Sequence, residues 1–126
     1  MLFEQLYAQG QVLGTALQGT LLRNQVISNN IANSDVPNFK ASRVDFEQQM
    51  IDALGDFPRN RRVDLSGVEP TIRTDRADLM QRIDNNNVDI EIEMVRLYEN
   101  SMRFDTMVSS IIANSRRLNT VLQRGQ

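Results

Sequence analysis

The stretch IEIEMVRLYENSMRFDTMVSSIIANSRRLNTVL, residues 90–122, decides the fold. Ten positions in it follow one another at alternating spacings of four and three residues: Ile90, Met94, Leu97, Ser101, Phe104, Val108, Ile111, Ser115, Leu118 and Leu122. All of them except the two serines are apolar. This period is typical of an α-helix that buries one seam against other helices. At about 1.5 Å of rise per residue the helix is roughly 50 Å long, more than a compact domain of this size needs. The sequence therefore predicts a long helix that packs in an assembly.

A second apolar set widens the stripe on this helix, so we expect it to meet more than one neighbour: Tyr98, Met102, Ile112 and Val121. Turn-forming residues 84–87 precede the helix, and we expect Asn87 and Asp89 to cap its first free amides. Arginines and then Gly125 mark its end.

The N-terminal segment, residues 2–33, has an imperfect helical seam: Phe3, Leu6, Leu13, Leu17, Ile27 and Ile31. Gly10, Gly14 and Gly19 interrupt it, each at a cost of about 1 kcal/mol relative to Ala. We predict a helix that is weak alone and that close approach of partners stabilises.

The middle of the chain is short. Residues 44–54 favour a small amphipathic helix capped by Ser42 or Asp45 and ended by Gly55, residues 71–74 a short extended piece, and residues 77–83 one or two helical turns. The predicted fold class is all-α, with a central helix, an irregular middle loop, and long terminal helices packed as a coiled-coil-like pair with neighbouring subunits. We expect one domain over 1–126, divided into 1–33, 34–87 and 88–126.

Composition excludes most catalytic chemistry. The 126 residues contain no Cys and no His, which removes the thiolate nucleophile, the imidazole base and the commonest transition-metal ligands. A net charge of -2 argues against a nucleic-acid binder. The N-terminus lacks the pattern of a cleaved secretory signal. We predict a protein that is not an enzyme, with no cofactor, metal or small-molecule substrate.

We interpret three groups of residues as structural and not as binding or catalytic sites. Glu91, Glu93 and Glu99 lie on one helix, but Glu91 and Glu93 point to different faces and no His accompanies them. This favours an exposed helix face over a hydrolytic pair or a divalent-ion site. The basic run Arg59, Asn60, Arg61, Arg62 favours a solvated loop over a phosphate or acidic-protein site. Three methionines are interpreted as core filler: Met94, Met102 and Met107.

The distinctive local sequence is NNIANSDVPNFK, residues 29–40, where the first helix must stop. Pro37 fixes its own φ, and Asn38 tolerates the left-handed conformation that a type II turn needs after Pro. Phe39 then serves as an apolar anchor that folds the chain back on the helix.

This motif, continued to NNIANSDVPNFKASRVDFE (29–47), resembles the signature of the bacterial flagellar rod and hook family. A second stretch, NNNVDIEIEMVRLYENSMRF (85–104), is similar to the opening of that family's C-terminal helix. The short middle favours the proximal-rod branch. Val36 and Asn38 depart from the Thr and Gly that are common in the family. The residues that match the family motif are Asn29, Asn30, Ile31, Ala32, Asn33, Pro37, Phe39 and Lys40.

The resemblance implies a structural subunit of the proximal rod of the flagellar basal body, assembling helically into a hollow drive shaft that transmits torque. It implies export by the flagellar type III apparatus without a cleaved signal, and a place in the periplasmic rod. The implied partners are copies of the chain, other rod proteins, and the membrane-embedded ring and export gate at the rod base.

Eleven residues are expected to form the subunit packing of such an assembly: Leu6, Leu13, Leu17, Ile27, Met94, Leu97, Phe104, Val108, Ile111, Leu118 and Leu122. The alternative from a different class is a cytoplasmic coiled-coil adaptor or export chaperone that binds partner helices.

Overall fold

The computed structural model describes residues 2–55, 63–75 and 82–124. Along the chain, the elements are α1 (Leu2–Ala32), β1 (Ser42–Asp45), α2 (Glu47–Leu54), β2 (Thr71–Thr74) and α3 (Ile90–Arg124). The prediction of two long terminal helices and a short central helix is confirmed.

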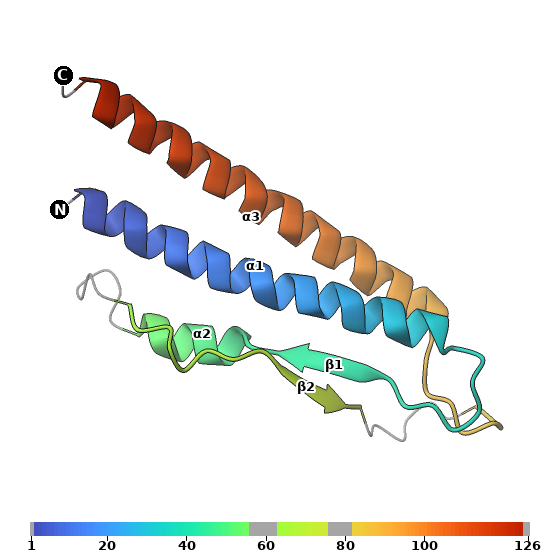
Figure 1. The fold of residues 1–126 in the computed structure, drawn as a ribbon. Coiled ribbons are helices and arrows are strands. Elements are labelled where there is room, and N and C mark those ends of the chain that lie inside the picture. The colour runs from blue at the N-terminus through green and yellow to red at the C-terminus, as the bar shows by residue number, and fades with distance from the viewer. Residues whose placement is uncertain (1, 56–62, 76–81, 125–126) are drawn as a thin grey trace.

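The helices α1 and α3 pack against each other in antiparallel directions, so the two chain termini lie at the same end of the molecule (Figure 1). The two helices converge where α1 ends and α3 begins, and they diverge toward the termini (Figure 1). The pairing is within one chain, and packing of these helices with neighbouring subunits stays a prediction.

A two-stranded antiparallel sheet adds to the predicted helices. β1 pairs with β2 in a register that places Val44 opposite Ile72. The extended piece predicted at 71–74 is therefore confirmed. The prediction that Ser42 or Asp45 caps the central helix is wrong, because both lie in β1, and α2 begins after Phe46 without a side-chain cap. The helical turns predicted at 77–83 and the basic run at 59–62 fall mostly or wholly outside the described residues.

The core lies between α1, the sheet and α2. Its buried members are Val26, Val44, Phe46, Met50 and Val68. Phe46 sits so tightly on α1 that a Cβ added at Gly19 would lie 2.5 Å from its ring, and the Arg23 guanidinium lies 5.0 Å from the ring centroid. This contact attaches the middle of the chain to α1.

Two of the three methionines interpreted as core filler are not in the core. Met94 and Met102 are 59% and 55% exposed, whereas Met107 is partly buried. No helix within the described ranges is both long and apolar enough to cross a membrane.

Candidate functional site

The two motifs, 29–40 and 85–104, meet at the end of the molecule where α1 and α3 converge. Asn30 is completely buried at the centre of this junction. Its side-chain Nδ2 donates to the Ser42 carbonyl at 2.9 Å, and its Oδ1 accepts from the Ser42 amide at 2.9 Å. One asparagine therefore satisfies both main-chain groups of a strand residue, as a neighbouring strand would.

Glu93 is the second buried member of the junction, with 1% of its surface exposed. One carboxylate oxygen accepts from Asn30 Nδ2 at 2.9 Å, and the other meets the Arg43 and Arg96 guanidinium groups at 2.9 and 2.8 Å. Two cations and an amide compensate the buried charge, as burial of a carboxylate requires. The interpretation of Glu93 as part of an exposed face is wrong, whereas Glu91 is exposed.

A shift in the helical face explains why sequence reasoning missed Glu93. The row of α3 that faces α1 includes Glu93, Leu97, Asn100 and Phe104. It shares Leu97 and Phe104 with the predicted row but has positions 93 and 100 where the prediction has 94 and 101. Two of these four residues are polar. The predicted seam has Met94 and Ser101 instead. The signal for the observed row is the continuation of the four-and-three spacing through polar residues.

Asn86 closes the C-terminal end of α1. Its buried Nδ2 lies within 2.8–3.0 Å of the carbonyls of Asn33, Ser34 and Val36, while its Oδ1 accepts from the Val88 amide at 2.8 Å. Carbonyls near a helix end lack intrahelical partners. A side chain from the second motif thus supplies partners to the exit of the first.

Asn87 and Asp89, the two expected caps, occupy different environments. The Asp89 carboxylate accepts from the amides of Glu91 and Ile92 at 3.0 and 3.2 Å, the bonds of an N-cap. Asn87 instead accepts from the Ala41 amide at 2.7 Å and donates to the Asp75 carbonyl at 2.8 Å. Its side chain therefore bridges the chain segments that flank the two strands, before β1 and after β2.

The turn within the first motif has the expected backbone. Asn38 has a φ of 62°, and the Phe39 amide donates to the Val36 carbonyl at 3.2 Å. Asn85 in the second motif also has a positive φ, 63°. The Lys40 ammonium donates to the Asn85 carbonyl at 2.8 Å and ties the two turns together.

The remaining motif residues lie around this junction. Asn29 accepts through its carbonyl from the Asn33 side chain at 2.8 Å. Ile31 and Phe39 are partly buried, and Ala32 and Pro37 are exposed.

The expected subunit-packing residues divide by exposure. Ile27 is buried, and Met94 and Leu122 are 59% and 53% exposed. The others are partly buried: Leu6, Leu13, Leu17, Leu97, Phe104, Val108, Ile111 and Leu118. The contact of these residues with neighbouring subunits stays a prediction.

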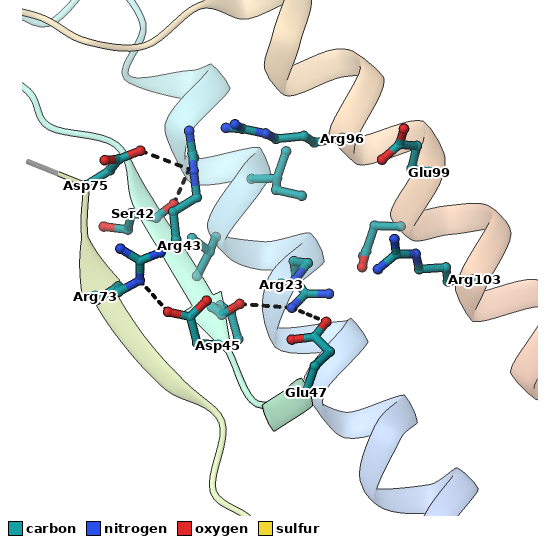
Figure 2. A pocket seen from close by; sticks show the side chains of 14 residues that line it. Arg23, Ser42, Arg43, Asp45, Glu47, Arg73, Asp75, Arg96, Glu99 and Arg103 are labelled. Carbon is teal, nitrogen blue, oxygen red and sulfur yellow. Dashed lines mark hydrogen bonds and ion pairs between the residues drawn. The ribbon is translucent and has the colours of Figure 1, made fainter. Parts of the chain in front are cut away.

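A polar cleft of about 390 Å³ opens beside the junction, between α1, the sheet and α3 (Figure 2). In Figure 2, Arg43 lies beside Asp75, Arg73 points to Asp45, and Arg23 points to Glu47, which it meets at 2.5 Å. Burial raises the pKa of the Glu47 carboxyl, but its hydrogen bonds with Arg23 and the backbone and the charge of Arg23 outweigh burial and hold this pKa below its ordinary value. These side chains are paired within the chain, which makes the cleft a structural ion-pair network.

The fold and the joined motifs define a class of protein. Residues 11–40, which run from α1 through the turn, match the family described as "Flagella basal body rod protein". The match covers the helix exit that carries the first motif.

Relatives extend the similarity to most of the chain. It is 32% identical over 124 residues to the flagellar basal body rod protein FlgB of Bacillus subtilis (strain 168), covering 92% of this chain and 94% of the relative. The FlgB proteins of Borreliella burgdorferi and Proteus mirabilis (strain HI4320) are 32% and 28% identical, covering 81% and 82% of this chain and 86% and 85% of their own lengths. The chain belongs to the FlgB family of flagellar basal body rod proteins. It is a structural subunit of the rod in the flagellar basal body and assembles with other rod components.

Proposed function

We propose that the chain forms the proximal part of the rod, as one domain over 1–126, and that copies assemble helically into a hollow shaft that transmits torque. The observation that carries this proposal is family membership over 92% of the chain. The exposed apolar side chains on α3 support it, because Tyr98, Met102 and Leu122 are 69%, 55% and 53% exposed in the single chain. Tyr98 and Met102 lie about one helical turn apart, and adjacent exposed apolar side chains mark protein interfaces.

The role we propose is structural and not catalytic. The polar side chains of the junction bind main-chain groups and each other, and they fix the geometry in which two helices leave the junction. The proposal places the chain in the periplasm after type III export without a cleaved signal, with the membrane-embedded ring and the export gate as neighbours below and rod proteins above.

Seam substitutions test the assembly. We expect Leu17→Asp, Phe104→Asp and Ile111→Asp each to abolish incorporation into rods while secretion of the chain continues, because a buried carboxylate without a partner is costly. Ser109→Asp on the exposed face of α3 is the control and is expected to assemble. Basal bodies are isolated and probed for the chain, and the secreted amount is measured in parallel. Loss of secretion alone would point to a different role.

Hydrogen exchange on dilute monomer separates the rod subunit from a soluble adaptor. We expect fast exchange near the termini, because the apolar faces there find partners only in the assembly. Full protection of residues 6–31 and 94–122 in a monomer would contradict the proposal.

A further inference from the structure

An apolar groove of about 740 Å³ lies between α2 and α3 and is lined on α1 by Ala16, Thr20 and Arg23. Met50 and Phe46 line it as buried residues, whereas Ile51 and Met102 line it with 61% and 55% of their surfaces exposed. Its α3 wall runs from Glu99 to Met107. Methionine side chains adapt to partner surfaces, and grooves of this kind receive amphipathic helices.

The charges of α3 are distributed unevenly along its length. Residues 90–105 contain Glu91, Glu93, Glu99 and Asp105 against Arg96 and Arg103, whereas residues 106–124 contain three arginines and no acidic residue. The other wall of the groove, α2, contributes Glu47, which is paired with Arg23 of α1. Because one half of α3 is acidic and the other basic, two copies attract when the end of one helix meets the beginning of another.

Glu99 stands at the groove without a charge partner. Neither it nor Arg103, which is four residues later on the same helix, makes an ion pair or hydrogen bond with any described residue. Both are exposed and line the groove.

The far end of α3 offers the matching surface. Val121 and Leu122 are 37% and 53% exposed. Arg117 lies four residues before Val121 and therefore on the same side of the helix, whereas Arg116 points about 100° away from Arg117. An apolar tip with an arginine beside it complements an apolar groove with a carboxylate at its edge.

We propose that this groove receives residues 117–122 of α3 from a second copy of the chain, with Val121 and Leu122 over Met102 and Ile51 and with Arg117 beside Glu99. The inference rests on the proposed function and names one contact of the assembly. The contact joins two different surfaces of the chain. A contact of that kind does not close on itself in a pair and generates an open filament when the rotation does not close a ring.

Disulfide mapping in assembled rods tests the contact directly, because the chain has no Cys of its own. We expect Met102→Cys and Val121→Cys, introduced together, to give a cross-linked product of two copies, confirmed with copies tagged at two sizes. A link within one chain is excluded, since residues 19 apart on a helix are roughly 28 Å apart and a disulfide needs Cα atoms within about 7 Å. Ile72→Cys with Val121→Cys is the control and is expected to give no product.

Charge reversal tests the same contact by rescue. Glu99→Arg and Arg117→Glu are each expected to lower incorporation into rods by about tenfold, and the double variant to restore it. Arg116→Glu makes the same charge change on another side of α3 and is expected to have little effect. Circular dichroism and the secreted amount establish that each variant folds and is exported.

Three results would overturn the inference: rods that assemble without the cross-link, no rescue by the double charge reversal, or a cross-link from residue 102 to a different rod protein. In all three cases the proposed function stands if the seam variants still block assembly. Failure of the seam variants to block assembly would count against the proposed function itself.

Discussion

The two ends of the α1–α3 pair are built on different physical principles. At the motif end, three side chains are completely or almost completely buried and polar: Asn30, Asn86 and Glu93, with at most 1% of their surfaces exposed. At the terminal end, the helices diverge, and a groove of about 510 Å³ separates Leu6 on α1 from Ile111 and Leu118 on α3. The motif end is complete in one chain, whereas the terminal end has apolar surface without a partner.

The difference teaches where the geometry of the subunit is specified. Hydrogen bonds and ion pairs have fixed directions, so a satisfied polar junction sets one angle and one register between two helices. Apolar surface is non-directional and accepts whichever neighbour covers it. A subunit with a rigid junction and open ends can present its helices to several neighbours in a constant orientation.

The largest expected effect comes from breaking the junction at Glu93. Glu93→Ala leaves Arg43, Arg96 and Asn30 without their shared partner, and we expect the free energy of unfolding to fall by about 3 kcal/mol. Glu91→Ala on the exposed side of the same turn is the control, with an expected change within about 0.5 kcal/mol. Urea denaturation of the purified chain measures both. Equal changes in the unfolding free energy of the two variants would show that the buried junction does not stabilise the chain more than an exposed site does.

Asn86 gives the next effect. Replacing it with Ala removes its hydrogen bonds to three carbonyls and the Val88 amide, and we expect a loss of about 2 kcal/mol because the buried Val88 amide loses its acceptor. Asn119→Ala, at an exposed position near the free end of α3, is expected to change stability little. If thermal unfolding placed both variants at the same midpoint, the contrast between the two ends would be wrong.

The glycines of α1 sharpen the comparison, since the effect of a Gly→Ala substitution on stability should change sign along the helix. A Cβ at Gly19 would collide with the Phe46 ring, so Gly19→Ala is expected to destabilise the chain by about 1–3 kcal/mol. No described atom lies within 4 Å of a Cβ added at Gly10 or Gly14. There Ala is expected to stabilise the monomer by about 0.5–1 kcal/mol each.

Denaturation of the three glycine variants, followed by recovery of each in basal bodies, measures this effect. Gly10→Ala or Gly14→Ala chains that are more stable but assemble poorly would show that neighbours approach α1 closely at these positions. Destabilised monomers of these two variants would contradict the prediction.

The smallest effect is the pH dependence of the Arg23–Glu47 pair. Because the folded-state pKa of Glu47 is lowered below its ordinary value of 4.5, the pair stabilises the fold above that value and loses this contribution as the pH falls through the lowered pKa. The Glu47 side chain is 49% exposed, so we expect less than about 1 kcal/mol. The difference in unfolding free energy between the chain and Glu47→Gln should shrink on acidification to about pH 3. If this difference in unfolding free energy stayed constant as the pH falls, the ion pair would not be its cause.

Sequence by itself determined the long helices, the short central helix, the positive φ of Asn38 and, through two motifs, the family. These properties depend on local periodicity and on turn-forming residues, which act over a few neighbouring positions. The prediction failed where a side chain takes its role from a distant segment. Periodicity passes over Glu93 and Asn100 and places Met94 and Ser101 in the seam.

Only the tertiary structure decided that Glu93 is buried, that Asn87 bridges Ala41 and Asp75, and that Ser42 begins a strand. Each of these depends on partners far apart in sequence, 63 residues in the case of Asn30 and Glu93. The free energy that buries a carboxylate comes from cations and amides brought to it by the fold, and no local pattern contains that information. The exposed apolar side chains of α3 are a similar case, because the partners that we propose for them lie in other subunits of the rod.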